Sequence, residues 1–306
     1  MPSLRFRLFA LASALAAWAL VAVGGVVRVT ESGLGCPDWP LCNGDVVPAE
    51  HKAPVIEYSH RATATIATLL VLATAAWAWR RYRWRSDVLA PALAAAVLVP
   101  LQAVLGAVVV WLELPRWIVA VHFVVGMIFL AATVVAAARA WSGTVAASGR
   151  AVWTAWTAAA AALALVAVGA SVVAAHADDA CGSEWPACNG GFARGGDLAA
   201  LQVAHRMLAY LVAGLALTFA VLAWRGAAPR LLGVLPVAAV FIQIGIGVSL
   251  VLVGESSAHG PIEALHVAGA GAVWATVVAV VALVGSPRFA ARPAHAPSPQ
   301  PKGARP

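Results

Sequence analysis

The sequence predicts an all-α polytopic membrane protein, with eight transmembrane helices arranged as two tandem four-helix bundles. Three observations predict this fold: the composition, a series of long apolar runs and an internal repeat. Of the 306 residues, 62% are hydrophobic and 11% are charged, whereas a soluble domain carries about 25% charged residues. A soluble enzyme is therefore excluded.

Eight apolar runs are each long enough to cross about 30 Å of hydrocarbon at a rise of about 1.5 Å per residue. They cover Leu8–Val27, Ile56–Trp79, Val88–Leu112, Trp117–Ala138, Val152–Ala175, Leu198–Trp224, Leu231–Val253 and Ala264–Gly285. The first run follows Arg5 and Arg7, as in a signal peptide, but its Gly24 belongs to the repeat described below. We therefore interpret this run as the first transmembrane helix.

The charges predict an orientation in the membrane. The net charge is +7, from 20 basic and 13 acidic residues. Fourteen of the 20 basic residues fall on the side of both termini: Arg5, Arg7, Arg80, Arg81, Arg83, Arg85, Arg139, Arg150, Arg225, Arg230, Arg288, Arg292, Lys302 and Arg305. Cytoplasmic loops are enriched in Lys and Arg, so that side is predicted to be cytoplasmic. These residues form no single patch, and no nucleic-acid partner is expected.

A shift of about 145 positions aligns the two halves of the chain. The matches are Gly24 with Gly169, Trp39-Pro40 with Trp185-Pro186, Cys42-Asn43-Gly44 with Cys188-Asn189-Gly190, His60-Arg61 with His205-Arg206, Trp79-Arg80 with Trp224-Arg225, Gln102 with Gln243, and His122 with His266. Four spans return the chain to its starting side, so the two units share one orientation. We expect units at 1–145 and 146–287, related by a pseudo-twofold axis along the membrane normal, and a disordered cytoplasmic tail at 288–306.

Four histidines lie inside the apolar runs, at one predicted membrane level near the outer ends of the even-numbered spans: His60, His122, His205 and His266. A single such histidine could simply hydrogen-bond between packed helices, but ionisable groups at membrane depth are usually functional. Zinc takes three or four ligands, and no further ligand repeats at this level. Heme iron takes two axial ligands in an apolar slot, for which a four-helix bundle is suited. We infer two bis-histidine heme sites, His60 with His122 and His205 with His266.

Two arginines follow these histidines directly in the sequence. Arg61 and Arg206 are placed to bind heme propionates by charge-assisted hydrogen bonds. The alternative is that their long side chains only extend to the membrane interface.

One position breaks the repeat next to the first site. Glu57 precedes His60 by three residues and shares its helix face, whereas Gln202 takes the same place before His205. Glu57 is therefore a candidate acid, base or charge stabiliser; the alternative is a carboxylate placed near a helix start by the dipole. We expect the chemistry in the N-terminal half and electron storage in the C-terminal half.

The four cysteines form two closely spaced pairs, Cys36 with Cys42 and Cys181 with Cys188, each in the outer loop after the first helix of a unit. In an oxidising compartment these pairs favour local disulfides over zinc clamps. Each would contribute roughly 2 kcal/mol by closing its loop and would shape a cap over a site. A redox role for the first pair is the alternative.

Other residues in the spans have packing roles in this interpretation. Gln102 and Gln243 are expected to make interhelical hydrogen bonds, with contact to a ligand as the alternative. Glycines within the spans let helices or a flat macrocycle approach closely: Gly24, Gly25, Gly106, Gly126, Gly245, Gly247, Gly269 and Gly271. His51, His176, His259 and His295 form no repeated pair and receive no role.

The motifs of both halves resemble the heme A synthase family. GGVVRVTESGLGCPDWPLCNG from Gly24 and IEYSHR from Ile56 resemble its first-unit signature, and QAVLGAVVV, CGSEWPACNG, LQVAHR and QIGIGV follow the same family. The resemblance covers nearly the whole chain apart from the tail. A cysteine pair in each half is similar to the bacterial branch of the family.

The resemblance implies an oxidoreductase of the bacterial cell membrane. It would oxidise the C8 methyl of heme O to a formyl group by successive hydroxylations, with oxygen from water, and so make heme A for cytochrome c oxidase. His60 and His122 would hold the substrate, with Glu57 nearby, and His205 and His266 would hold a resident heme b. The implied partners are heme O synthase, the oxidase assembly machinery, an electron acceptor or donor and membrane lipid; a homo-oligomer is compatible with the sequence.

Two other functions use the same residues. A diheme cytochrome b that exchanges electrons with quinone has the same four ligands, but it needs hemes on opposite sides of the membrane, whereas the parallel repeat places both at one level. A heme carrier or oxidase assembly factor would bind heme in both units and transform it in neither. Glu57 distinguishes the enzyme from the carrier.

Overall fold

The computed structural model describes residues 1–48, 51–188, 190–191, 196–254 and 256–285. In this part of the chain all regular structure is helical, apart from two isolated β-bridges. The helices are α1 (Leu4–Val29), α2 (Lys52–Arg81), α3 (Ser86–Trp111), α4 (Arg116–Trp141), α5 (Gly149–Ala174), α6 (Gly196–Trp224), α7 (Leu231–Val253) and α8 (His259–Val284). Each is long and apolar enough to cross a membrane. The all-α fold with eight spans is confirmed, and the chain is a multi-pass membrane protein.

The helix ends differ from the predicted apolar runs where polar groups find partners. Helix α8 begins at His259, five residues before the predicted Ala264, and so includes Glu263. That carboxylate forms an ion pair with Arg28 of α1, which allows a charged residue inside the helix. At the other end of the chain, α1 begins at Leu4 because the Ser3 hydroxyl accepts a hydrogen bond from the Phe6 N–H and caps the helix. The predicted tail at 288–306 lies outside the described residues.

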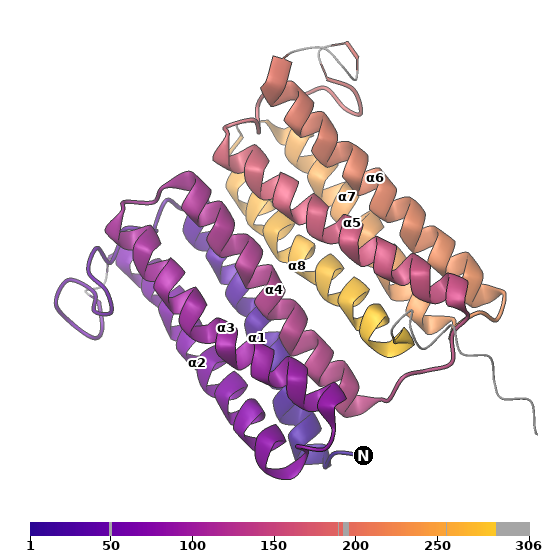
Figure 1. The fold of residues 1–306 in the computed structure, drawn as a ribbon. Coiled ribbons are helices and arrows are strands. Elements are labelled where there is room, and N and C mark those ends of the chain that lie inside the picture. The colour runs from indigo at the N-terminus through magenta and orange to yellow at the C-terminus, as the bar shows by residue number, and fades with distance from the viewer. Residues whose placement is uncertain (49–50, 189, 192–195, 255, 286–306) are drawn as a thin grey trace, which may run out of the picture.

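The helices gather into two groups of four, α1–α4 and α5–α8, which lie side by side (Figure 1). Within each group the contacts form a ring, α1–α2–α3–α4–α1 and α5–α6–α7–α8–α5. Between the groups, α1 contacts α8, α4 contacts α8, and α4 contacts α5. If α1–α4 are exchanged in order with α5–α8, the α1–α8 contact becomes the α5–α4 contact. The α4–α8 contact maps onto itself. This pattern supports the predicted pseudo-twofold relation; that axis and the division near residue 145 stay predictions.

Tryptophan side chains connect the two groups by hydrogen bonds to backbone carbonyls of the facing helix. The Trp18 indole N–H of α1 donates to the Ala268 carbonyl of α8 over 3.0 Å, and the Trp274 indole N–H of α8 donates to the Met127 carbonyl of α4 over 2.7 Å. Both carbonyls belong to helix interiors, so these bonds fix α8 against α1 and α4 at defined heights.

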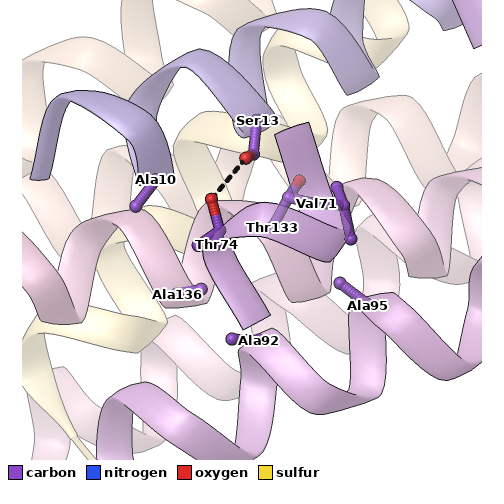
Figure 2. A pocket seen from close by; sticks show the side chains of 8 residues that line it. All are labelled: Ala10, Ser13, Val71, Thr74, Ala92, Ala95, Thr133 and Ala136. Carbon is purple, nitrogen blue, oxygen red and sulfur yellow. Dashed lines mark hydrogen bonds between the residues drawn. The ribbon is translucent and has the colours of Figure 1, made fainter. Parts of the chain in front are cut away.

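The core of the first group contains a polar cluster around a small cavity of about 10 Å³ (Figure 2). The Ser13 and Thr74 hydroxyls lie 3.0 Å apart in this cluster, and Thr133 also lines the cavity. All three side chains are buried. The repeat offset places Ala158, Phe219 and Val277 at these positions of the second group, where all three are buried as well. The two cores therefore differ in polarity at one matched depth.

We expect Thr74→Val to lower the free energy of unfolding by about 1 kcal/mol, because it removes one partner of a buried hydrogen bond. The double variant Ser13→Ala/Thr74→Val should cost less than the sum of the two single changes, since the contact is lost only once. Unfolding in detergent followed by circular dichroism measures each value. Ser249→Ala is the matched control, because that hydroxyl bonds only within its own helix, to the Gly245 carbonyl. Strictly additive losses would contradict a direct Ser13–Thr74 interaction.

Candidate functional site

Each of the four helix histidines packs against a glycine of the preceding helix. A Cβ atom added to the glycine would meet the imidazole at short range: Gly24 meets His60 Nε2 at 3.3 Å, Gly106 meets His122 Cε1 at 3.5 Å, Gly169 meets His205 Cε1 at 2.9 Å, and Gly247 meets His266 Cε1 at 3.0 Å. The contacts at Gly24, Gly169 and Gly247 are closer than nearly all real Cβ contacts, whereas the contact at Gly106 is an ordinary van der Waals distance. Glycine therefore gives three of the four imidazoles the space they occupy.

His205 and His266, the second predicted pair, lie close together. Their rings have centroids 6.4 Å apart with an interplanar angle of 61°. The pairing of His60 with His122 stays a prediction. Because the contacts within each group form a ring, α2 lies diagonally across from α4, and α6 from α8. Each pair therefore faces the interior of its own bundle.

Glutamines from α3 and α7 contact the second histidine of each pair, and the Gln243 amide also contacts its imidazole ring. The Gln102 side-chain N–H donates to the His122 carbonyl over 3.2 Å. The Gln243 amide donates to the His266 carbonyl over 2.8 Å, and its nitrogen lies 3.0 Å from His266 Nδ1. The predicted interhelical hydrogen bonds are confirmed. Neither glutamine oxygen has a hydrogen-bond partner among the described residues.

The histidine pairs fit a group that takes two axial nitrogen ligands. Within the described part of the chain, no group of three or more His, Cys, Asp and Glu side chains is arranged to hold a metal ion. The Nδ1 atom of His122 is buried and has no partner there, and an unpaired buried nitrogen costs free energy. Two facing imidazoles on glycine-lined helix surfaces are the donor set of a bis-histidine heme.

A carboxylate and an arginine bind the first outer loop to α2. Both Arg61 terminal nitrogens donate to loop carbonyls, Nη1 to Asp38 and Leu41 over 2.8 and 2.6 Å and Nη2 to Cys36 over 2.7 Å. Nη2 also forms a 2.5 Å ion pair with Glu57 Oε1, while Oε2 accepts a 2.8 Å hydrogen bond from the Cys36 N–H. Glu57 is only 4% exposed. We call this arrangement the outer-loop latch.

The second unit has the same latch with an amide in place of the carboxylate. Arg206 Nη1 donates to the carbonyls of Glu184 and Ala187 over 2.9 and 2.6 Å, and Nη2 donates to Gln202 Oε1 over 2.8 Å. The Gln202 amide nitrogen donates in turn to the Asp178 carbonyl. The arginine charge is thus paired within the first latch and not within the second.

A disulfide closes each outer loop beside its latch. Cys36 and Cys42 are bonded with Cα atoms 4.4 Å apart, and Cys181 and Cys188 with Cα atoms 4.7 Å apart. In the first loop the half-buried Asp38 carboxylate accepts hydrogen bonds from the backbone N–H groups of Gly44 and Asn43, which lower the pKa of Asp38. These local bonds give the loop a defined shape over the end of α2.

Some contacts of the site residues were predicted from the sequence and others were not. Arg61 and Arg206 were predicted to bind propionates, and the structure places both guanidinium groups on loop carbonyls; the propionate role stays a prediction. The glycine partners of the histidines were signalled by the repeat, because Gly106 and Gly247 carry the same offset as Gln102 and Gln243. The backbone carbonyls that accept hydrogen bonds from Arg61 and Arg206 could not be predicted from the sequence, because every residue has a carbonyl group.

The three remaining described histidines stay apart from the pairs. His51 precedes α2 and makes no side-chain cap. His176 lies just beyond α5 at a φ of 54°. His259 begins α8, and its Nδ1 lies 2.7 Å from the Gly254 carbonyl. His295 lies outside the described residues.

Comparison with known proteins connects these motifs to one family. A family model described as a cytochrome oxidase assembly protein matches residues 7–278. The chain is 32% identical to a heme A synthase of Alkalihalophilus pseudofirmus over 132 residues, which are 42% of this chain and 44% of the relative. It is 38% identical to a heme A synthase of Bacillus licheniformis over 109 residues, 35% and 36% of the two chains. With a heme A synthase of Geobacillus kaustophilus it shares 37% identity over 127 residues, 40% of each.

The aligned part spans less than half the length of these curated relatives. The family model, in contrast, extends from α1 into α8 and so includes both histidine pairs, both latches and both cysteine pairs. The resemblance inferred from the sequence motifs is confirmed, and the chain belongs to the cytochrome oxidase assembly protein family.

Proposed function

We propose that this protein is a heme A synthase, which oxidises the C8 methyl of heme O to a formyl group by successive hydroxylations. The observation that carries the proposal is one site built twice with one chemical difference, Glu57 in the first unit and Gln202 in the second. A binding protein has no need for that difference, whereas an enzyme needs a proton-accepting group at the substrate. The heme A synthases that match this chain support the same assignment.

In this proposal the two units have different roles. His60 and His122 hold the heme O substrate and release the heme A product in the 1–145 unit. His205 and His266 hold a resident heme b in the 146–287 unit, and this group supplies electron transfer when bound. The Gln243 contact to His266 Nδ1 orients that ligand, as second-shell groups commonly do.

Glu57 takes up protons in this proposal. Converting a methyl group and water into a formyl group releases protons and electrons in equal number, so a base near the substrate promotes each step. Both carboxylate oxygens of Glu57 are oriented by donors, Arg61 and the Cys36 N–H. The latch therefore fixes the carboxylate three residues from His60, on the same face of α2.

The cellular setting follows from the charge distribution and the family. We place the protein in the bacterial cell membrane with both termini in the cytoplasm and the disulfide loops and histidine pairs toward the outer face. Heme O synthase supplies its substrate, and the cytochrome c oxidase assembly machinery receives its product. The disulfides, buried beneath their loops, have a structural role in this scheme.

A heme carrier for oxidase assembly is the second candidate, and one observation favours it. Glu57 and Gln202 make equivalent bonds to their latch arginines, so the carboxylate also has a purely structural role. A diheme cytochrome b that passes electrons across the membrane is disfavoured, because both histidine pairs lie in equivalent places of parallel units.

Glu57→Gln separates the enzyme from the carrier. The new amide oxygen can still accept the Arg61 hydrogen bond, but the amide NH2 group would face the Cys36 N–H, so that loop contact is lost. We expect heme to stay bound and heme A production to fall by roughly 100-fold or more. Pigment extraction followed by chromatography and mass analysis measures heme O and heme A. Gln202→Glu is the comparison variant: its new oxygen would face the Asp178 carbonyl, so it also costs one loop contact but removes no carboxylate from the first site. We expect a much smaller fall in heme A production. Unchanged heme A production in Glu57→Gln would support the carrier.

Substitution of the histidines tests the division between the units. We expect His205→Ala or His266→Ala to remove the low-spin heme b spectrum, because each removes one axial ligand. His60→Ala or His122→Ala should keep that spectrum and block conversion of heme O. Optical spectra and pigment analysis of the purified variants measure both properties. If all four variants had the same spectrum, the assignment of one heme to each unit would be wrong.

A further inference from the structure

A groove runs along the inner end of α2, at the end of the bundle where α1 begins. It is a shallow, open hollow of about 440 Å³, and the residues that line it all belong to α2: Ala73, Ala76, Trp77, Arg80 and Arg81. The first four of these residues follow a spacing of three and four and so share one helix face. The two alanines are exposed, and their small side chains leave room beside the helix.

Aromatic rings of α1 hold one wall of this groove in place. The Trp77 ring packs against Phe6 and Phe9, with centroids 5.8 and 5.6 Å away. Phe6 is fully buried, so Trp77 is anchored to the core of the first group. The Trp77 ring, which forms this wall, is therefore held in a fixed position and is not a flexible surface side chain.

The polar end of the groove carries positive charge without partners. Arg80, Arg81 and Arg83 are exposed and form no ion pair among the described residues. The next arginine, Arg85, differs because it is bound to Asp87 by two hydrogen bonds of 2.8 Å. Three unpaired guanidinium groups within four residues favour an anionic ligand.

The equivalent place in the second unit lacks both features. The repeat offset puts Thr218, Val221 and Gly226 where the first unit has Ala73, Ala76 and Arg81. Larger side chains thus replace the alanines, and two of the three unpaired arginines are missing, because Ala228 also takes the place of Arg83. Of the two arginines in that turn, Arg230 lies over the Trp224 ring at 5.0 Å. The general enrichment of arginine at cytoplasmic helix ends does not account for this difference between two copies of one unit.

We propose that this groove binds an anionic phospholipid of the adjacent leaflet. The phosphate lies against Arg80 and Arg81, with Arg83 adding to the positive field, and an acyl chain follows the apolar surface of Ala73, Ala76 and Trp77. The groove lies within a membrane-spanning helix, and the exposed Trp79 and Trp84 flank its charged end, as expected at the level of lipid head groups. Basic pockets at this level bind anionic lipids.

The proposal is independent of the heme sites. Along α2, Arg80 lies 20 residues from His60, or about 30 Å at the helical rise. Loss of lipid binding would therefore leave the proposed function untouched, and loss of heme conversion would leave the lipid site untouched.

Native mass spectrometry of the purified full-length protein tests the site, with phosphatidylglycerol and phosphatidylcholine as probes. We expect retained phosphatidylglycerol, little retained phosphatidylcholine, and roughly 10-fold or more weaker phosphatidylglycerol retention in Arg80→Gln/Arg81→Gln, because each arginine near the surface adds to anionic-lipid binding. Arg225→Gln/Arg230→Gln removes the same charge from the second unit and should retain the lipid.

A second variant tests the apolar half of the groove without changing charge. Ala73→Leu/Ala76→Leu should fill the groove and also lower phosphatidylglycerol retention. We expect this lipid to raise the melting temperature of the parent protein, and the variant should lose that rise. Three results would each overturn the proposal: equal losses in both arginine double variants, equal retention of the two lipids, or unchanged retention in the alanine variant. Competition by glycerol phosphate alone would show an anion site without a lipid groove and would also overturn it.

Discussion

The contact between each helix histidine and a glycine of the neighbouring helix is the constraint on which both sites depend. A methyl group at Gly169 would lie 2.9 Å from the His205 ring, so even alanine would force the imidazole to move. The ring is thereby held by backbone rather than by flexible side chains, and it faces its partner across the diagonal of the bundle. In a membrane, where helices associate through close packing rather than the hydrophobic effect, small residues are what make such an approach possible.

The outer-loop latches extend this rigidity from the helices to the loops. A loop of irregular structure presents backbone carbonyls that need donors, and one arginine in each unit supplies several. Glu57 and Gln202 complete the latches from the same position, yet only Glu57 pairs the charge of its arginine. Because the two side chains contact their arginines in the same way, the main difference between the two latches is the charge of this side chain. A disulfide in each loop limits the alternatives to the latched conformation.

Much of the fold was predictable because a membrane span must be long, apolar and helical, and the sequence contains eight such runs. The start of α8 was missed because Glu263 interrupted the apolar run, and its distant partner Arg28 gave no local signal. The pairing of His205 with His266 was predictable from the repeat, whereas the setting of Arg61 was not. Its position beside His60 suggested a ligand contact, but its partners are mainly backbone carbonyls, which have no signature in a sequence. Such contacts become visible only when the loop is folded.

Three differences between the two units, at three depths, make the first unit more polar. Glu57 replaces an amide near the start of α2, the Ser13–Thr74 pair replaces Ala158 and Phe219 in the core, and Arg81 replaces Gly226 at the end of α2. Buried polar groups cost free energy unless they are paired, and the first two differences are paired within the unit. Arg81 has no such partner among the described residues. The shared glycines, histidines and latches give the two units the same geometry. A functional difference between the units therefore has to come from residues that differ, and these added polar groups are the first candidates.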